Sequence, residues 1–111
     1  MEKEELLQKE PYKTIVKLMW FGSLYAKPAK YFCVATGLSD RAFRKCVETM
    51  REHGLCIVSD VNGYYFPVTE NELERYIRRT EKTARSYFYS LRSAKRELRR
   101  MKQEAQIKIE E

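Results

Sequence analysis

Basic side chains between residues 75 and 102 are the strongest chemical feature of this 111-residue sequence. The segment holds eleven arginines and lysines against only Glu81 and Glu97, so its formal charge is +9, whereas the whole chain carries +6. The basic residues are Arg75, Arg78, Arg79, Lys82, Arg85, Arg92, Lys95, Arg96, Arg99, Arg100 and Lys102. Such a field attracts polyanions, which suits either phosphate groups or an acidic partner. The alternative is the solvated exterior of a coiled coil, which usually mixes both signs of charge.

No pattern in the sequence points to catalysis, a metal or a cofactor. A P-loop, a nucleophile motif and metal-ligand spacings are missing. The single histidine, His53, lies beside the end of a predicted helix, where a contact with the helix dipole or plain exposure is expected. Cys33, Cys46 and Cys56 form no CxxC pair and lie in apolar patterns, which predicts buried reduced thiols. We therefore expect a protein that is not an enzyme and takes neither a cofactor nor a small-molecule ligand.

Composition indicates one small domain with an appendage, and the basic charge balance of the chain favours a polyanionic partner. The chain is 43% hydrophobic, and its pI is about 9.3. The start Met-Glu-Lys-Glu-Glu lacks the apolar core of a signal peptide, and the uncharged runs are too short to span a bilayer. A cytoplasmic protein without membrane contact is the expectation.

A capped helix and a hairpin are predicted in the middle of the chain. Ser39 is a good N-cap and Gly54 a good stop for a helix whose buried stripe is Ala42, Phe43, Cys46, Val47 and Met50. Strands at Ile57 and at residues 64–66 follow, and Asn62-Gly63 is a strong signal for the turn between them.

Two further helices are predicted before that unit. The first starts with Pro11 at its first position and runs to about Phe21, with Gly22 as its stop. Residues 23–25 are expected to form a short strand, and Pro28 opens the second helix, which ends at the turn Gly37-Leu38-Ser39. Trp20, Phe21 and Tyr25 are assigned to the core.

One long helix is predicted for the rest of the chain. Thr69 and Glu72 form a capping box, and neither proline nor glycine interrupts residues 70–106. Apolar or small residues recur there at alternating steps of four and three: Leu73, Ile77, Thr80, Ala84, Tyr87, Leu91, Ala94, Leu98, Met101 and Ala105. This heptad seam predicts a homodimer, with parallel pairing, antiparallel pairing and packing back on the first helix left open. Tyr87-Phe88-Tyr89 is richer in aromatics than one seam needs, which suggests contacts on two sides.

The predicted fold is mainly α with a small β-hairpin, an α+β class. Its parts are an N-terminal lead-in at residues 1–10, a helical domain with the hairpin at 11–66, and the long basic dimerisation helix at 67–111.

The middle of the chain resembles the winged helix-turn-helix domain of biotin-operon-repressor-type regulators and of small phage and bacterial regulators. The resemblance covers about residues 12–66. The shared residues are Gly37-Leu38-Ser39, Phe43 followed by Arg44-Lys45, Val47, Met50, Gly54-Leu55, Ile57, Ser59 and Gly63-Tyr64. One departure is Lys30-Tyr31-Phe32, where such domains more often have an acidic residue and a Leu-Ala pair.

The resemblance implies that the helix after Ser39 enters the major groove of duplex DNA. The DNA-binding candidates on it are Ser39, Asp40, Arg41, Arg44, Lys45 and Glu48; Lys27, Lys30 and Arg51 are candidate phosphate contacts, and Asn62 is the one candidate on the hairpin turn. The expected function is sequence-specific DNA binding by a dimeric transcriptional or replication regulator of phage or mobile-element type. An oligomeric interaction or assembly module is the alternative. RNA binding by the basic helix is a third possibility without an RNA-specific signature.

Overall fold

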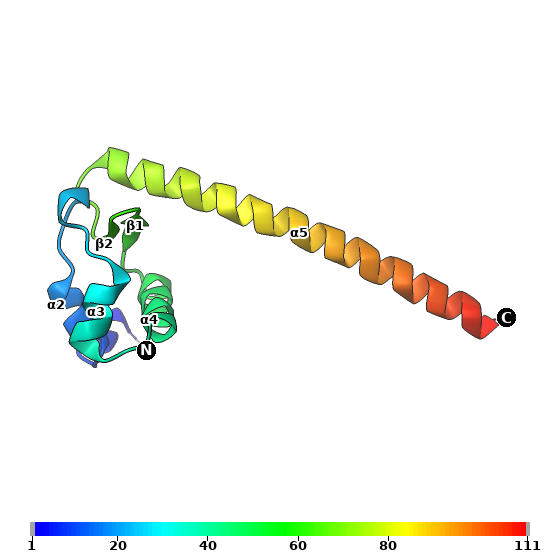
Figure 1. Cartoon of the computed structure of the whole chain (residues 1–111), viewed down its shortest axis with the longest axis horizontal. Coiled ribbons are helices and arrows are strands. Elements are labelled where there is room, and N and C mark those ends of the chain that lie inside the picture. The colour runs from blue at the N-terminus through cyan, green and yellow to red at the C-terminus, as the bar shows by residue number, and fades with distance from the viewer. Residues whose placement is uncertain (1, 111) are drawn as a thin grey trace. The chain divides into compact units, whose positions relative to one another are not determined.

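The computed structural model describes residues 2–110 and shows helices with one two-stranded antiparallel hairpin (Figure 1). The elements are α1 (Lys3–Leu6), α2 (Tyr12–Leu18), the 3-10 turn η1 (Ser23–Tyr25), α3 (Ala29–Thr36), α4 (Asp40–Glu52), β1 (Val58–Asp60), β2 (Gly63–Tyr65) and α5 (Glu70–Glu110). The predicted α+β class is therefore confirmed. The chain forms two compact units that divide between Tyr76 and Ile77, within α5.

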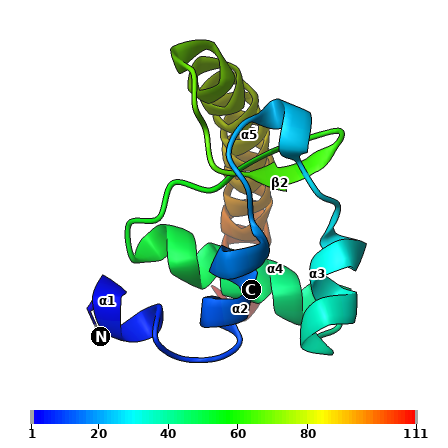
Figure 2. The ribbon, with the colours of Figure 1, turned by 90° about the vertical axis from the view of Figure 1, so that its left-hand side faces the viewer.

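An aromatic stack forms the centre of the first unit. Phe32 of α3 and Phe43 of α4 lie face to face with ring centroids 5.0 Å apart, and Tyr64 of β2 meets Phe43 edge-on at 5.1 Å. The buried residues around the stack are Leu6, Ile15, Met19, Val47, Met50 and Ile57. The helices α1 to α4 gather at one end of this unit and the hairpin lies across from them (Figure 2). Because Leu6 is buried, the lead-in is part of the packed unit.

The turn between α3 and α4 follows the prediction. Gly37 adopts the left-handed conformation (φ 77°, ψ 6°), which an L-residue with a side chain adopts only at a cost. The Ser39 hydroxyl accepts a hydrogen bond of 3.1 Å from the Ala42 amide, which caps α4. At the other end of α4, His53 Nδ1 lies 2.8 Å from the Thr49 carbonyl oxygen, so the imidazole forms a hydrogen bond with the last turn of the helix.

Helix α2 ends at Leu18, three residues before the predicted end, and Pro11 is its N-cap rather than its first residue. The backbone becomes extended at Met19, because Trp20 and Gly22 form backbone hydrogen bonds with Phe66, the residue that follows β2. The Phe66 amide donates to the Trp20 carbonyl (2.9 Å), and the Gly22 amide donates to the Phe66 carbonyl (2.8 Å). The strand predicted at residues 23–25 is also wrong, since these residues form η1.

The aromatic residues after α2 lie on the surface, which corrects their assignment to the core. Trp20 is 51% exposed, Phe21 64% and Tyr25 51%. Met19 fills the core position instead, because the helix has already ended there. The exposed rings pack on neighbours, Trp20 on Tyr25 at 5.5 Å and Phe21 on Phe66 at 5.2 Å.

The cysteines are free, as predicted, but not fully buried. Cys56 is exposed, whereas Cys33 and Cys46 are half-buried. Burial raises the pKa of the Cys46 thiol, which favours its neutral form.

The hairpin turn lies one residue earlier than predicted. Asp60 pairs with Gly63, so the two-residue loop is Val61-Asn62 and Gly63 belongs to β2. The Asn62 amide donates to Asp60 Oδ1 at 2.7 Å, which stabilises the loop.

Gly63 is needed for a close approach of two backbones. A Cβ atom placed there would lie 2.1 Å from the Lys27 carbonyl oxygen and 2.7 Å from the Pro28 nitrogen. This approach lets the Tyr64 amide donate a hydrogen bond of 2.8 Å to the Lys27 carbonyl oxygen. The backbone of Gly63 itself has a positive φ of 128°.

We expect Gly63→Ala to lower the free energy of unfolding by about 2–3 kcal/mol. Gly37→Ala, where a Cβ meets nothing within 4 Å, is the control and should cost less in chemical denaturation. Equal losses in the two variants would contradict the role assigned to the Gly63 contact.

The capping box at the start of α5 forms and reaches further than predicted. The Glu72 amide donates to Thr69 Oγ1 (3.2 Å), and Glu72 Oε1 accepts from the amides of Val68 and Thr69. Glu72 Oε2 also accepts from the Ser23 amide at 2.7 Å, which ties η1 to the helix start. The Ser23 amide and then the Val68 amide are the main causes that lower the pKa of the Glu72 carboxyl. From here α5 continues without interruption to Glu110, beyond the predicted end at 106.

Candidate nucleic-acid interface

The outer face of α4 consists of Asp40, Arg41, Arg44, Lys45 and Glu48, all of which are exposed. At about 100° per residue these five side chains cover one side of the helix, opposite the buried Phe43, Val47 and Met50. The core contacts fix the rotation of the helix about its axis. The predicted DNA-binding residues of this helix are thereby brought together on one surface, except Ser39, whose hydroxyl is used by the helix cap.

Ion pairs order part of this face. Arg44 Nη2 lies 3.0 Å from Asp40 Oδ2, and Lys45 Nζ lies 3.5 Å from Glu48 Oε1. Arg41 has no ion-pair partner within the part of the chain that the structure describes. Exposed i,i+3 and i,i+4 pairs on a helix are worth only about 0.2–0.5 kcal/mol, so they hold the side chains loosely and can be replaced by a stronger partner. Two arginines on such a face can donate pairs of hydrogen bonds to guanine O6 and N7 or to phosphate oxygens.

Lys27 was predicted to contact phosphate, but its ammonium group is engaged within the first unit. Its Nζ donates to the Leu18 carbonyl (3.4 Å) and to the Tyr31 hydroxyl (3.3 Å). It also lies over the rings of Trp20 and Tyr31, 4.5 and 4.4 Å from their centroids. These contacts stabilise the segment after α2, and they turn the charge away from a role as a free phosphate ligand. Lys30, the second residue of α3, is exposed and remains a candidate.

Arg51 is also a structural residue rather than the predicted phosphate contact. Its Nε donates to the Ile57 carbonyl at 2.8 Å, and its guanidinium lies 5.3 Å from the centre of the Tyr76 ring. The Nη2 atom is buried. Arg51 therefore joins the end of α4 to the strand entry and to the first turns of α5. Nothing in the sequence distinguishes it from the exposed arginines, because its partners come from distant positions.

The hairpin tip offers little to an anion. Its residues Asp60, Val61, Asn62 and Gly63 include no basic side chain. Asn62 is exposed and can form a hydrogen bond, while the Asp60 carboxylate accepts from the Ser23 hydroxyl at 2.8 Å. The hairpin serves mainly to complete the core through Tyr64 and Tyr65.

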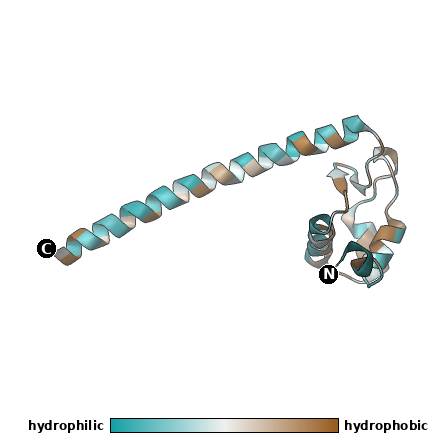
Figure 3. Cartoon of the chain, turned by 180° about the vertical axis from the view of Figure 1, so that it is seen from behind, coloured by the Kyte–Doolittle hydropathy of each residue, from teal (hydrophilic) through white to brown (hydrophobic). Residues whose placement is uncertain are grey.

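The predicted heptad seam is exposed in the second unit. Leu91, Leu98 and Met101 are 50%, 53% and 55% exposed, and Ala84 and Ala94 of the same row are exposed too. In the first unit Leu73 is half-buried. Figure 3 shows apolar positions recurring along α5 between hydrophilic ones. In a monomer this periodic apolar row would be exposed to water. Pairing with a second helix would bury it.

None of the protein-family models, curated proteins or solved structures compared with the chain matches it. Within residues 2–110, no helix is both long and apolar enough to cross a bilayer. The same residues include no group of three or more His, Cys, Asp or Glu side chains that could hold a metal ion.

Proposed function

We propose that the protein binds duplex DNA sequence-specifically through α4, as a homodimeric regulator of transcription or replication of phage or mobile-element type. The observation that carries the proposal is the outer face of α4, which presents Arg41, Arg44 and Lys45 while the opposite side is locked into the core by Phe43. Two helices joined by the Gly37-Leu38-Ser39 turn and followed by a hairpin support a winged helix-turn-helix reading, in which α4 is the recognition helix. Such a role belongs in the cytoplasm.

A substitution at Arg44 tests this assignment. Arg44→Ala is expected to weaken binding to a selected site by about 1–3 kcal/mol and to relax base preference at one position, because the paired donors are lost. Arg44→Lys is the matched control: it keeps the positive charge but not the planar fork, so base preference should still relax while the salt dependence is preserved. Selection from a random DNA pool followed by anisotropy titration measures both quantities. An enriched palindrome with unchanged preference in both variants would contradict the assignment.

Self-association is proposed through the α5 seam, whose pairing residues are Leu73, Ile77, Ala84, Tyr87, Leu91, Ala94, Leu98 and Met101. We expect the full chain to sediment as a dimer at micromolar concentration and a chain truncated at Thr83 to sediment as a monomer. The truncation keeps the whole core of the first unit, so circular dichroism and thermal melting should still show a folded domain. A monomeric full chain, or a truncated chain that remains dimeric, would remove the seam from the proposal.

An oligomeric assembly module is the second candidate, favoured by the exposed apolar surface at Trp20, Phe21 and Leu24. A gel shift with random duplex separates the two candidates, because a pure assembly module gives no salt-sensitive shift.

A further inference from the structure

Two aromatic side chains of α5 are exposed outside the seam. Phe88 is 63% exposed and Tyr89 60%. At about 100° per residue, Tyr89 lies on the side opposite the seam and Phe88 at the edge of the seam. Pairing through Leu91 and Leu98 therefore leaves Tyr89 uncovered. Two adjacent exposed rings outside the centre of the seam form an aromatic patch, and such patches mark interaction sites.

The same outer side of α5 carries Lys82, Arg85, Arg92, Arg96 and Arg99. Arg85 and Arg92 lie one turn before and one turn after the aromatic pair, so basic and aromatic side chains alternate along one face. The sequence has no acidic residue from position 82 to position 96. The Arg92 guanidinium is 6.0 Å from the centre of the Tyr89 ring, so the two groups are direct neighbours.

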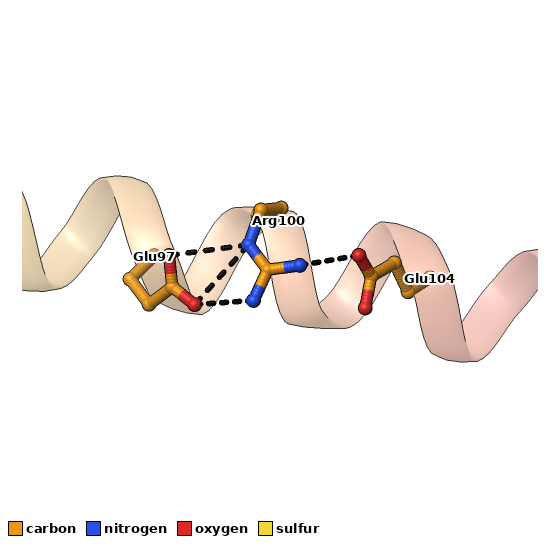
Figure 4. Close-up of polar contacts among 3 residues, drawn as sticks. All are labelled: Glu97, Arg100 and Glu104. Carbon is orange, nitrogen blue, oxygen red and sulfur yellow. Dashed lines mark hydrogen bonds and ion pairs between the residues drawn. The ribbon is translucent and has the colours of Figure 1, made fainter.

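Glu97 and Glu104, the acidic residues that follow this basic stretch most closely, are both paired with Arg100. Arg100 Nε lies 3.1 Å from both oxygens of Glu97, and Arg100 Nη1 pairs with Glu104 (Figure 4). The bond to Arg100 lowers the pKa of the Glu97 carboxyl, so Glu97 stays charged and engaged. Within residues 2–110, Arg92, Lys95, Arg96 and Arg99 form no ion pair. Their charge is left for an external anion.

These four basic side chains line a shallow, open hollow on the helix surface. Arg92, Lys95, Arg96 and Arg99 line an open pocket of about 280 Å³. The pocket begins one turn beyond Tyr89, and its lining can donate hydrogen bonds from several directions to a phosphate group. An aromatic platform beside a hollow lined by cations has the two features that recur along a nucleic acid strand, in which each base is attached to a phosphate.

We propose that this outer face of α5 binds single-stranded nucleic acid, with phosphates in the hollow and unpaired bases stacked on Tyr89 and Phe88. In a duplex the base faces are stacked on one another and only the base edges are accessible, so the bases cannot stack on the two rings. A single strand offers base faces to every exposed ring, and each base stacked on an aromatic side chain contributes independently of sequence. The site is separate from the α4 face proposed for duplex DNA.

The test is a titration of the full chain with fluorescein-labelled oligothymidylate of about 20 nucleotides, longer than a typical site of roughly 4–16 nucleotides. We expect Tyr89→Ala to weaken binding at least about 5-fold and Phe88→Ala/Tyr89→Ala about 30-fold, because each stacking contact is lost. Tyr89→Trp keeps a ring and should bind at least as tightly as the unmodified protein. Ile107→Ala, which removes a side chain 57% exposed on the same helix, is the matched control and should leave binding unchanged. Circular dichroism checks that the helix content of each variant is retained.

Duplex DNA of the same length distinguishes this site from the α4 face. The aromatic variants should bind duplex as the unmodified protein does, and Arg44→Ala should weaken duplex binding while leaving oligothymidylate binding intact. Oligouridylate in parallel assigns the face to RNA or DNA strands according to which binds more tightly. Oligothymidylate affinity that is absent, unchanged by Phe88→Ala/Tyr89→Ala, or lost in Arg44→Ala would overturn the proposal.

Discussion

Replacing Phe43 by alanine is expected to lower the free energy of unfolding by about 3–5 kcal/mol, more than the loss expected for Gly63→Ala. Phe43 is fully buried, stacks on Phe32 at 5.0 Å and meets the edge of Tyr64 at 5.1 Å. The substitution removes a whole ring from between α3, α4 and the hairpin. The cavity that remains cannot be closed by small shifts, because three elements converge on it.

Chemical denaturation followed by circular dichroism measures this loss. Val34→Ala is the control on α3, because Val34 is 77% exposed and should change stability by no more than about 0.5 kcal/mol. Phe43 belongs to the core of the first unit, so the loss should appear in the unfolding transition of that unit. An unchanged unfolding midpoint in Phe43→Ala would show that the rotation assigned to α4, and with it the outer face of that helix, is incorrect.

Affinity for duplex DNA is expected to fall by roughly 10²- to 10⁴-fold between about 50 and 200 mM salt. With about five to eight phosphate contacts per dimer, the slope of log affinity against log salt should be about −4 to −7, because each contact releases condensed counterions. The exposed cations Arg41, Arg44 and Lys45 of α4, together with Lys30 of α3, supply the charges. The measurement is anisotropy of a labelled duplex over a salt series.

Two variants locate the charges responsible. Lys30→Ala, at an exposed candidate phosphate contact, should reduce the magnitude of the slope by about one unit and weaken binding to all sequences alike. Lys27→Ala should leave the slope unchanged, because the Lys27 ammonium is held by Leu18, Tyr31 and Trp20. An affinity that is flat across the salt series would rule out the proposed binding to duplex DNA.

Features specified within a few residues of sequence could be predicted. Ser39 caps α4 three residues before its partner amide, Gly37 takes the left-handed position, and Thr69 and Glu72 bond to each other. The spacing of Phe43, Val47 and Met50 determined which side of α4 is buried, and hence which side carries Arg41 and Arg44. The unbroken helix of α5 followed from the absence of glycine and proline. These results depend on local hydrogen bonds and on helical periodicity, which the sequence contains directly.

The remaining features were decided only by tertiary contacts. Phe66 bonds to Trp20 and Gly22 across more than forty residues, which ends α2 early and leaves Trp20 on the surface. Lys27 and Arg51 look like free cations in the sequence, but carbonyl groups and aromatic rings from other elements hold them in place. The sequence predicts Gly63 to be a turn residue, but its lack of a side chain instead allows the Lys27 backbone to approach closely. The reason is the same in each case: a local pattern specifies what a residue can do, whereas its actual partner depends on which distant segment the fold brings within hydrogen-bonding distance.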